Sequence, residues 1–160
     1  MTTLTLRRTG RRSWTLTSDT GVLHGTLRTG PGLVCAEAKA ADGSWSVRAH
    51  GPRRRRVTAG PPGAVALELE PPLARSARRD APARWETPRG FRRYEGLLTH
   101  AGGRVAARTS TRPGAAVTVE VTGHQPDLVV LTVCFALLTR RRRDGMRALW
   151  VAAITSHGPR

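Results

Sequence analysis

An apolar segment, LVVLTVCFALL, runs from residue 128 to residue 138 and constrains the fold more than any other feature. Pro126 and Asp127 precede it and are typical of a helix start, because proline suits the first turn and a carboxylate complements the positive end of the helix dipole. The arginines at residues 140–143 follow it and complement the negative end. A helix that is apolar on every side must be enclosed by protein or by lipid. The segment therefore predicts one buried helix over about residues 127–142.

Enclosure by protein explains this helix better than enclosure by lipid. At about 1.5 Å per residue, residues 128–138 reach roughly 17 Å, whereas the hydrocarbon core of a bilayer is about 30 Å thick. Extending the segment to Trp150 would carry the arginines and Asp144 into hydrocarbon, which is costly for each charge. We therefore predict no transmembrane span and expect the rest of the chain to surround the helix.

The residues before the helix alternate between short strand-like segments and turns. Val65, Leu67 and Leu69 alternate with small or acidic residues, as in a strand with one buried face. The Asp42-Gly43 pair is typical of a tight hairpin turn. This pattern predicts about ten to twelve strands. The clearest cover residues 13–17, 22–29, 33–39, 44–49, 53–59, 64–70, 84–87, 92–99, 104–110 and 116–122.

Two segments lack a clear strand pattern. Residues 71–83 are rich in Pro, Ala and Arg and are predicted to form a connecting loop. Residues 148–154, ALWVAAI, are either a last strand or a short second helix, and periodicity does not separate the two. A chain of 160 residues suits one domain. We expect this domain to cover residues 1–154, with a short tail at 155–160.

The order of these motifs resembles the group that contains the tubby C-terminal domain, the LURP-one-related proteins and the phospholipid scramblases. The group would imply a closed antiparallel β-barrel of about twelve strands around a hydrophobic helix near the carboxyl terminus. This chain differs in having further residues after the helix, and the group's phosphoinositide-binding lysine and arginine set has no residue-by-residue match here. The residues that carry the resemblance are Trp14, Leu16, Asp19, Gly21 and Gly25 in a W-x-L-x-x-D-x-G-x-x-x-G opening, the strands 103–108 and 117–121, and Asp127 before the apolar helix.

Physical arguments agree with this mainly-β fold. A sheet that closes into a barrel has no exposed edge strand that could pair with another chain. A barrel of about twelve strands is too wide to be filled by its own side chains. The helix predicted at 127–142 is the apolar element that would fill it.

The chain is strongly basic, with 27 Lys and Arg against 11 Asp and Glu and a formal net charge of +16. Lys39 is the only lysine, which indicates the codon bias of a GC-rich genome. Codon bias explains the preference for arginine but not the scarcity of acidic residues. Part of the positive charge is therefore expected to serve a polyanionic partner.

No feature of the sequence predicts an enzyme. The usual phosphate-loop, dinucleotide-binding, nucleophile-elbow and zinc-protease motifs do not occur. Glu68 and Glu70 share one face of a strand, but that face is expected to be exposed. We predict no catalytic residue, no metal and no cofactor. The histidines share no metal-ligand spacing and are expected at turns or on the surface: His24, His50, His100, His124 and His157.

The cysteines and the amino terminus predict a protein without disulfides in the cytoplasm. Cys35 and Cys134 lie far apart and form no CxxC pair, so we expect two free thiols in apolar surroundings. The first residues, MTTLTLRRTG, lack the apolar core of a secretory signal. A cytoplasmic location follows, peripheral to the membrane if the partner is a lipid.

Two arginine runs are the candidate binding residues. If both lie at one end of the barrel, they form a patch whose planar guanidinium groups can bind phosphate oxygens in pairs. Helix capping and ordinary solvated surface are the simpler alternative. The runs comprise Arg53, Arg54, Arg55, Arg56, Arg140, Arg141, Arg142 and Arg143.

Three functions fit these observations. The first is a non-enzymatic barrel that binds anionic phospholipid headgroups or another phosphorylated ligand through the arginine runs. The second is a basic nucleic-acid-binding protein, which is disfavoured because aromatic residues for base stacking are few. The third is a protein interaction scaffold without a small ligand. A lipid-translocating activity, by analogy with the scramblases, is a weaker fourth.

Overall fold

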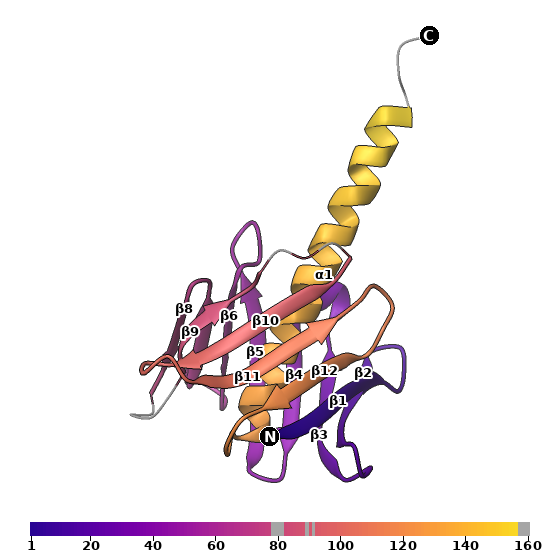
Figure 1. Ribbon diagram of the computed structural model, residues 1–160. Helices are drawn as coiled ribbons and strands as arrows, with labels where there is room; N and C mark the ends of the chain where they lie inside the picture. The colour runs from indigo at the N-terminus through magenta and orange to yellow at the C-terminus, as the bar shows by residue number, and fades with distance from the viewer. Residues whose placement is uncertain (78–81, 89, 91, 157–160) are drawn as a thin grey trace.

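The computed structural model describes residues 1–77, 82–88, 90 and 92–156, and it consists of twelve strands, one short 3-10 helix and one long α-helix (Figure 1). The 3-10 helix covers Pro31–Leu33, and the α-helix, α1, covers Asp127–Ser156. The strands are β1 (Thr2–Arg8), β2 (Ser13–Ser18), β3 (Leu23–Thr29), β4 (Cys35–Ala40), β5 (Gly43–His50), β6 (Arg56–Gly60), β7 (Leu67–Glu70), β8 (Leu73–Ser76), β9 (Pro82–Glu86), β10 (Tyr94–His100), β11 (Val105–Thr111) and β12 (Val117–Val121).

The strands form a closed barrel in which each strand pairs antiparallel with the next. β12 pairs with β1 through partners that include Leu4 with Val119, so the sheet has no free edge. This arrangement confirms the predicted mainly-β closed barrel with one C-terminal helix. Because consecutive strands alternate in direction, every second connecting loop lies at the same end of the barrel.

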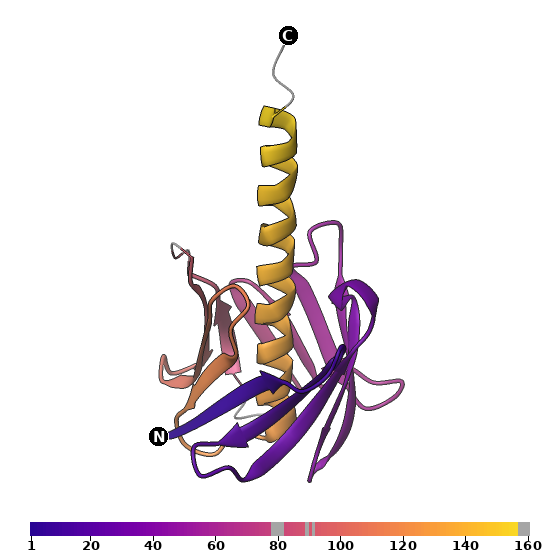
Figure 2. The ribbon, with the colours of Figure 1, turned by 90° about the vertical axis from the view of Figure 1, so that its right-hand side faces the viewer.

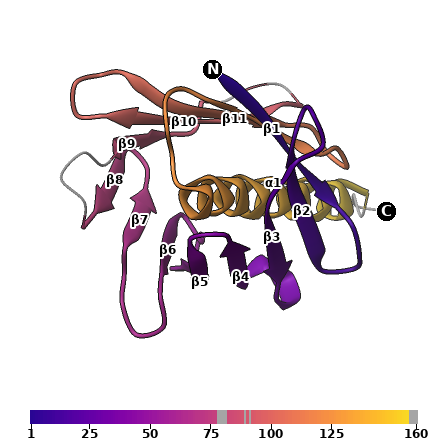
Figure 3. The same cartoon turned by 90° about the horizontal axis from the view of Figure 1, so that it is seen from below.

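The first half of α1 fills the barrel. Figure 3 views the molecule along the barrel and shows strands on all sides of the helix. Leu131, Val133, Phe135 and Leu138 are fully buried. They pack against inward-facing strand residues in one continuous core, which includes Leu6, Leu16, Leu27, Val47, Leu69, Leu98 and Val119. The alternation of buried and exposed residues along the strands produces this inner surface.

The structure corrects two sequence predictions. The predicted loop at 71–83 contains β8 and the start of β9, and its residues 78–81 lie outside the described residues. β8 was missed because Ala74 is the only inward-facing apolar residue of Leu73–Ser76 that is buried, which gives almost no hydrophobic pattern. Residues 148–154 form neither a strand nor a second helix, because α1 continues without a break from Asp127 past residue 142 to Ser156.

Gly96 in β10 leaves room for the buried ring of Trp85. A methyl group at Gly96 would overlap this ring and lie 2.6 Å from Thr109 Oγ1. We expect Gly96→Ala to lower the free energy of unfolding by about 1–3 kcal/mol, the usual cost of overpacking a core. Urea denaturation measures this difference. Gly102→Ala is the matched control, since a methyl group there meets no atom within 4 Å; equal stability of the two variants would contradict the prediction.

Candidate functional site

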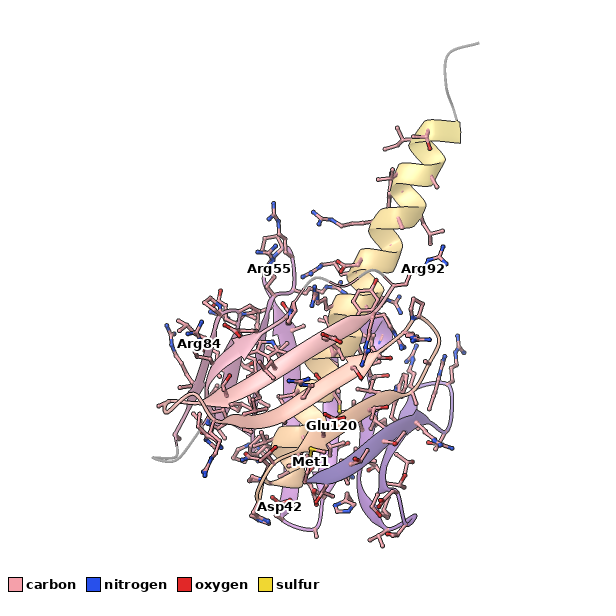
Figure 4. The ribbon with its side chains drawn as sticks, in the orientation of Figure 1. Met1, Asp42, Arg55, Arg84, Arg92 and Glu120 are labelled. Carbon is pink, nitrogen blue, oxygen red and sulfur yellow. The ribbon has the colours of Figure 1, made fainter. Side chains whose placement is uncertain are left out.

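The end of the barrel from which α1 emerges carries most of the candidate arginines. α1 begins after β12 and crosses the barrel, so it leaves at the end that holds the loops following odd-numbered strands. Figure 4 shows Arg55 and Arg92 near this end and Asp42 at the other. We call this end the exit rim. It comprises the loops 9–12, 30–34, 51–55, 71–72, 87–93 and 112–116 together with helix residues 140–147, and residues 89 and 91 lie outside the described residues.

The two arginine runs meet at the exit rim although about 90 residues separate them. Arg143 Nη1 donates a hydrogen bond to the carbonyl oxygen of Arg53 at 2.8 Å. Arg54 Nη1 in turn donates to the carbonyl oxygen of Gly32 at 2.8 Å, which ties the loop at 51–55 to its neighbour. The helix, this loop and the segment between β9 and β10 line a hollow of about 610 Å³. Among the described residues, its charged lining consists of Arg54, Arg55, Arg140, Arg143, Asp144 and Arg147.

Arg140 holds the helix in place at the rim. Its guanidinium group donates to the carbonyl oxygens of Pro88 at 3.2 Å and Glu95 at 3.3 Å. It also lies over the ring of Tyr94, with its Cζ 5.9 Å from the ring centroid. Its side chain is only 14% exposed. Arg140 is therefore mainly a structural residue that joins α1 to the barrel.

Arg141 has a similar structural role beside the next loop of the rim. Its Nη1 lies within hydrogen-bond distance of Thr111 Oγ1 at 2.9 Å and donates to the carbonyl oxygens of Arg112 at 3.0 Å and Ala115 at 2.8 Å. Burial lowers the pKa of Arg141, and these acceptors compensate the guanidinium group for lost water. The contacts fasten α1 to the loop between β11 and β12.

A second hollow at the rim, of about 530 Å³, lies beside Arg141 and the exposed Arg142. Its remaining charged lining comes from Arg8, Arg11 and Arg12 of the first hairpin. These three residues and Arg147 were not predicted from the sequence. The repeated arginines of RRTGRR at 7–12 were a visible signal, but nothing local to that segment places it beside residues 140–143.

Arg53 and Arg56 line neither hollow. Arg53 is exposed and contributes its backbone carbonyl to Arg143. Arg56 begins β6, where it is exposed and pairs in register with His50 of β5. Burial and the nearby Arg56 charge lower the pKa of His50. Of the candidate residues, those that line a hollow are Arg54, Arg55, Arg140, Arg141, Arg142 and Arg143.

Acidic residues are scarce at the exit rim. Its loop sequences, TGRR, GPGLV, GPRRR, PP, TPRGFRR and RPGAA, contain no Asp or Glu. Asp144 on the helix is close to two arginines, with its carboxylate 3.3 Å from Arg143 Nε and 3.9 Å from Arg140 Nε. Glu95 at the nearby strand end pairs with Arg93 at 3.0 Å. The rim therefore keeps a large excess of positive charge.

The opposite end of the barrel offers a larger hollow of about 880 Å³. His100 and Gln125 approach each other there at 3.3 Å, and Arg104 is the one Arg, Lys, Asp or Glu among the described residues of its lining. Among the residues that the structure describes, no group of His, Cys, Asp or Glu could hold a metal ion. Cys134 is fully buried, which raises the pKa of its thiol and makes it unreactive. The exit rim is therefore the better candidate site.

Comparisons with known proteins establish similarity of fold. No family model and no curated protein sequence matches this chain. A protein from Arabidopsis thaliana, AT5G01750, whose structure was solved by X-ray crystallography, is similar, with a TM-score of 0.58 and 11% sequence identity over 85% of this chain and 88% of that chain. At this identity the similarity shows the fold alone. The closed barrel around a C-terminal helix agrees with the architecture that the sequence resemblance implied.

Proposed function

We propose that this protein is a non-enzymatic, tubby-like barrel whose exit rim binds phosphorylated anions, in particular the headgroups of anionic phospholipids. The observation that carries the proposal is the convergence of arginines from distant parts of the chain at one end of the barrel. Arg8, Arg55 and Arg142 come from different elements and line hollows at this end. The rim loops contain no acidic residue to neutralise them.

The exposed rim arginines have the right chemistry for phosphate. A guanidinium group presents paired donors that match two phosphate oxygens, and clustered cations attract an anionic surface. Arg140 and Arg141 already donate to the barrel, so they orient the site more than they bind. Among the described residues, no hydrogen-bond or ion-pair partner is found for the guanidinium groups of Arg11, Arg12, Arg55 and Arg142, which leaves them available to a ligand.

Nucleic acid would use the same charge but finds few stacking partners at the rim among the described residues. Proteins that bind single strands usually stack bases on exposed aromatic rings. Trp14 and Trp85 are buried in the barrel, Tyr94 is half-buried beneath Arg140, and the exposed Trp150 lies on the projecting part of α1, beyond the rim. This distribution favours a phosphate or headgroup ligand over an oligonucleotide.

Flotation with vesicles tests the proposal. We expect the protein to bind vesicles of phosphatidylcholine and phosphatidylserine, to ignore phosphatidylcholine alone, and to bind more weakly as salt rises. Titration with inositol hexakisphosphate asks whether free phosphates suffice, and an excess oligonucleotide serves as competitor. If an oligonucleotide added at the same total charge as the anionic lipid displaces the protein from vesicles, nucleic acid would be the better ligand. If the protein binds neither vesicles nor inositol hexakisphosphate, the proposal is wrong and the protein interaction scaffold is the remaining function.

A further inference from the structure

Figure 2 shows that the second half of α1 extends beyond the strands of the barrel at the exit rim. Its large apolar side chains are widely exposed: Met146 is 51%, Leu149 72%, Trp150 68%, Val151 60% and Ile154 68% accessible. An exposed set of this size marks an interaction surface. Among the described residues, no helix is both long and apolar enough to cross a membrane.

This projecting segment, residues 145–156, has no polar face. Residues 148–154, ALWVAAI, are apolar without interruption and cover nearly two helical turns. Its charged residue, Arg147, lies at the base, near Asp144 and beside the rim. A helix that is apolar all round belongs in an apolar environment, and inside the chain that environment is already occupied by the first half of α1.

We propose that the projecting segment inserts obliquely into one leaflet of an anionic membrane while the exit rim rests on its headgroups. This inference rests on the proposed function, because the rim supplies the headgroup contacts. Residues 146–156 extend about 16 Å at 1.5 Å per residue, so a tilted segment stays shallower than the hydrocarbon of one leaflet, which is about 15 Å deep. The arginines at residues 140–147 would then lie at headgroup level and the apolar residues 148–154 among the acyl chains, and the tilt avoids burying the charge of Arg160 at the bilayer centre.

The charge distribution selects this orientation. A helix that lies flat in the interface needs a polar face turned to water, and residues 148–156 contain no charged residue at all. Between residues 140 and 156 the charges lie at the base of the helix, whereas Arg160 beyond it favours a tilted insertion over one that ends at the bilayer centre. Arg147 lies one turn beyond Arg143, and its long side chain can extend back to the headgroups.

The same charges disfavour a second copy of the chain as the occupant. Parallel pairing of two projecting segments would bring two exit rims together, each with arginines in its loops and on its helix. Antiparallel pairing would place each apolar tip against the partner's arginines. An anionic membrane, in contrast, complements the rim and the apolar segment at once.

Quenching of Trp150 by brominated lipid tests the insertion directly. Trp14 and Trp85 are buried, and Trp45 is half-buried on β5, so Trp150 is the tryptophan that can reach acyl chains. We expect strong quenching by acyl-brominated phosphatidylcholine in vesicles that also contain phosphatidylserine. Trp150→Phe should remove this quenching, and Trp45→Phe should preserve it. Vesicle binding without quenching in the native protein would overturn the inference.

A paired-serine variant measures how much the segment contributes. Leu149→Ser with Ile154→Ser should weaken vesicle binding by about a hundredfold, since each large aliphatic side chain removed from water contributes about a factor of ten or more. Ala148→Ser with Ala152→Ser is the matched control, because it adds the same hydroxyls to the same helix and should change affinity by less than about threefold.

Binding to inositol hexakisphosphate separates the two proposals. The soluble ligand contacts only the rim, so the Leu149→Ser, Ile154→Ser variant should bind it with native affinity. If the variant also binds vesicles like the native protein, the insertion is wrong and headgroup binding stands. If the native protein binds neither inositol hexakisphosphate nor vesicles, both proposals are wrong. A dimer in solution that this variant converts to monomer would assign the segment to self-association and overturn the inference.

Discussion

Phe135→Asp is expected to leave the chain without a stable fold. Phe135 is fully buried on the part of α1 that fills the barrel, among the aliphatic and aromatic residues of the core. Loss of a buried phenylalanine alone costs about 3–5 kcal/mol, and an unpaired buried carboxylate adds several kcal/mol. A domain of this size is stable by about 5–15 kcal/mol. Circular dichroism and the dispersion of amide signals in NMR spectra measure the outcome, and Leu131→Asp should behave alike.

Leu149→Asp is the matched control for this prediction. It places the same carboxylate on the same helix, but residue 149 is 72% exposed and lies beyond the barrel. We expect its free energy of unfolding to stay within about 0.5 kcal/mol of the native value, as for ordinary surface changes. A folded Phe135→Asp protein with native-like NMR dispersion would mean that α1 does not fill the barrel.

Replacement of four rim arginines should abolish most binding to anionic vesicles. The variant combines Arg11→Ser, Arg12→Ser, Arg55→Ser and Arg142→Ser, which are exposed residues of three different elements. Each basic residue near an anionic surface contributes about 1 kcal/mol, so the four together correspond to a loss of about a thousandfold in affinity. Co-sedimentation with vesicles of phosphatidylcholine and phosphatidylserine at fixed low salt measures the change. Arg140 and Arg141 are left intact because they fasten α1 to the barrel.

The control for this variant removes equal charge elsewhere. Lys39, Arg75, Arg104 and Arg108 are exposed on the barrel wall or toward the opposite end, and their replacement by serine changes the net charge by the same amount. We expect this control to lower affinity by less than about tenfold, because these charges lie outside the exit rim and salt screens their attraction to the membrane over a Debye length of about 10 Å. Equal losses in both variants would show that binding follows net charge, and the exit rim would not be a site.

The arginine run at residues 140–143 contains both structural residues and solvent-exposed residues, and the sequence alone does not distinguish them. Arg141 is tied to the loop between β11 and β12, whereas its neighbour Arg142 is exposed beside the second hollow. Successive residues of a helix point about 100° apart, so one side of the run meets the barrel and another faces solvent. A structural role in fastening α1 and a binding role are therefore compatible within four consecutive residues.

The sequence by itself determined most of the strands and the buried half of the helix, and its resemblance to the tubby and LURP-one group implied that the strands close into a barrel. Leu128 to Leu138 cannot remain in water as a helix, and period-two alternation such as Leu67 and Leu69 marks strands with one buried face. β8 was not predicted because Ala74 buries so little apolar surface that no alternation of apolar and polar residues is visible in this segment. β1 was also left out of the predicted strands, although its Leu4 and Leu6 are buried and alternate with polar residues.

Only the tertiary structure decided where α1 meets solvent and which arginines share a site. The barrel wall ends near residue 140, so the arginines that resemble a helix stop instead reach the rim and the helix continues to Ser156. The contact between Arg143 and the Arg53 carbonyl depends on strand direction and on closure of the sheet between β1 and β12. Such contacts join residues distant along the chain, and no local propensity or periodicity encodes them, because they arise from how the complete sheet closes around its helix.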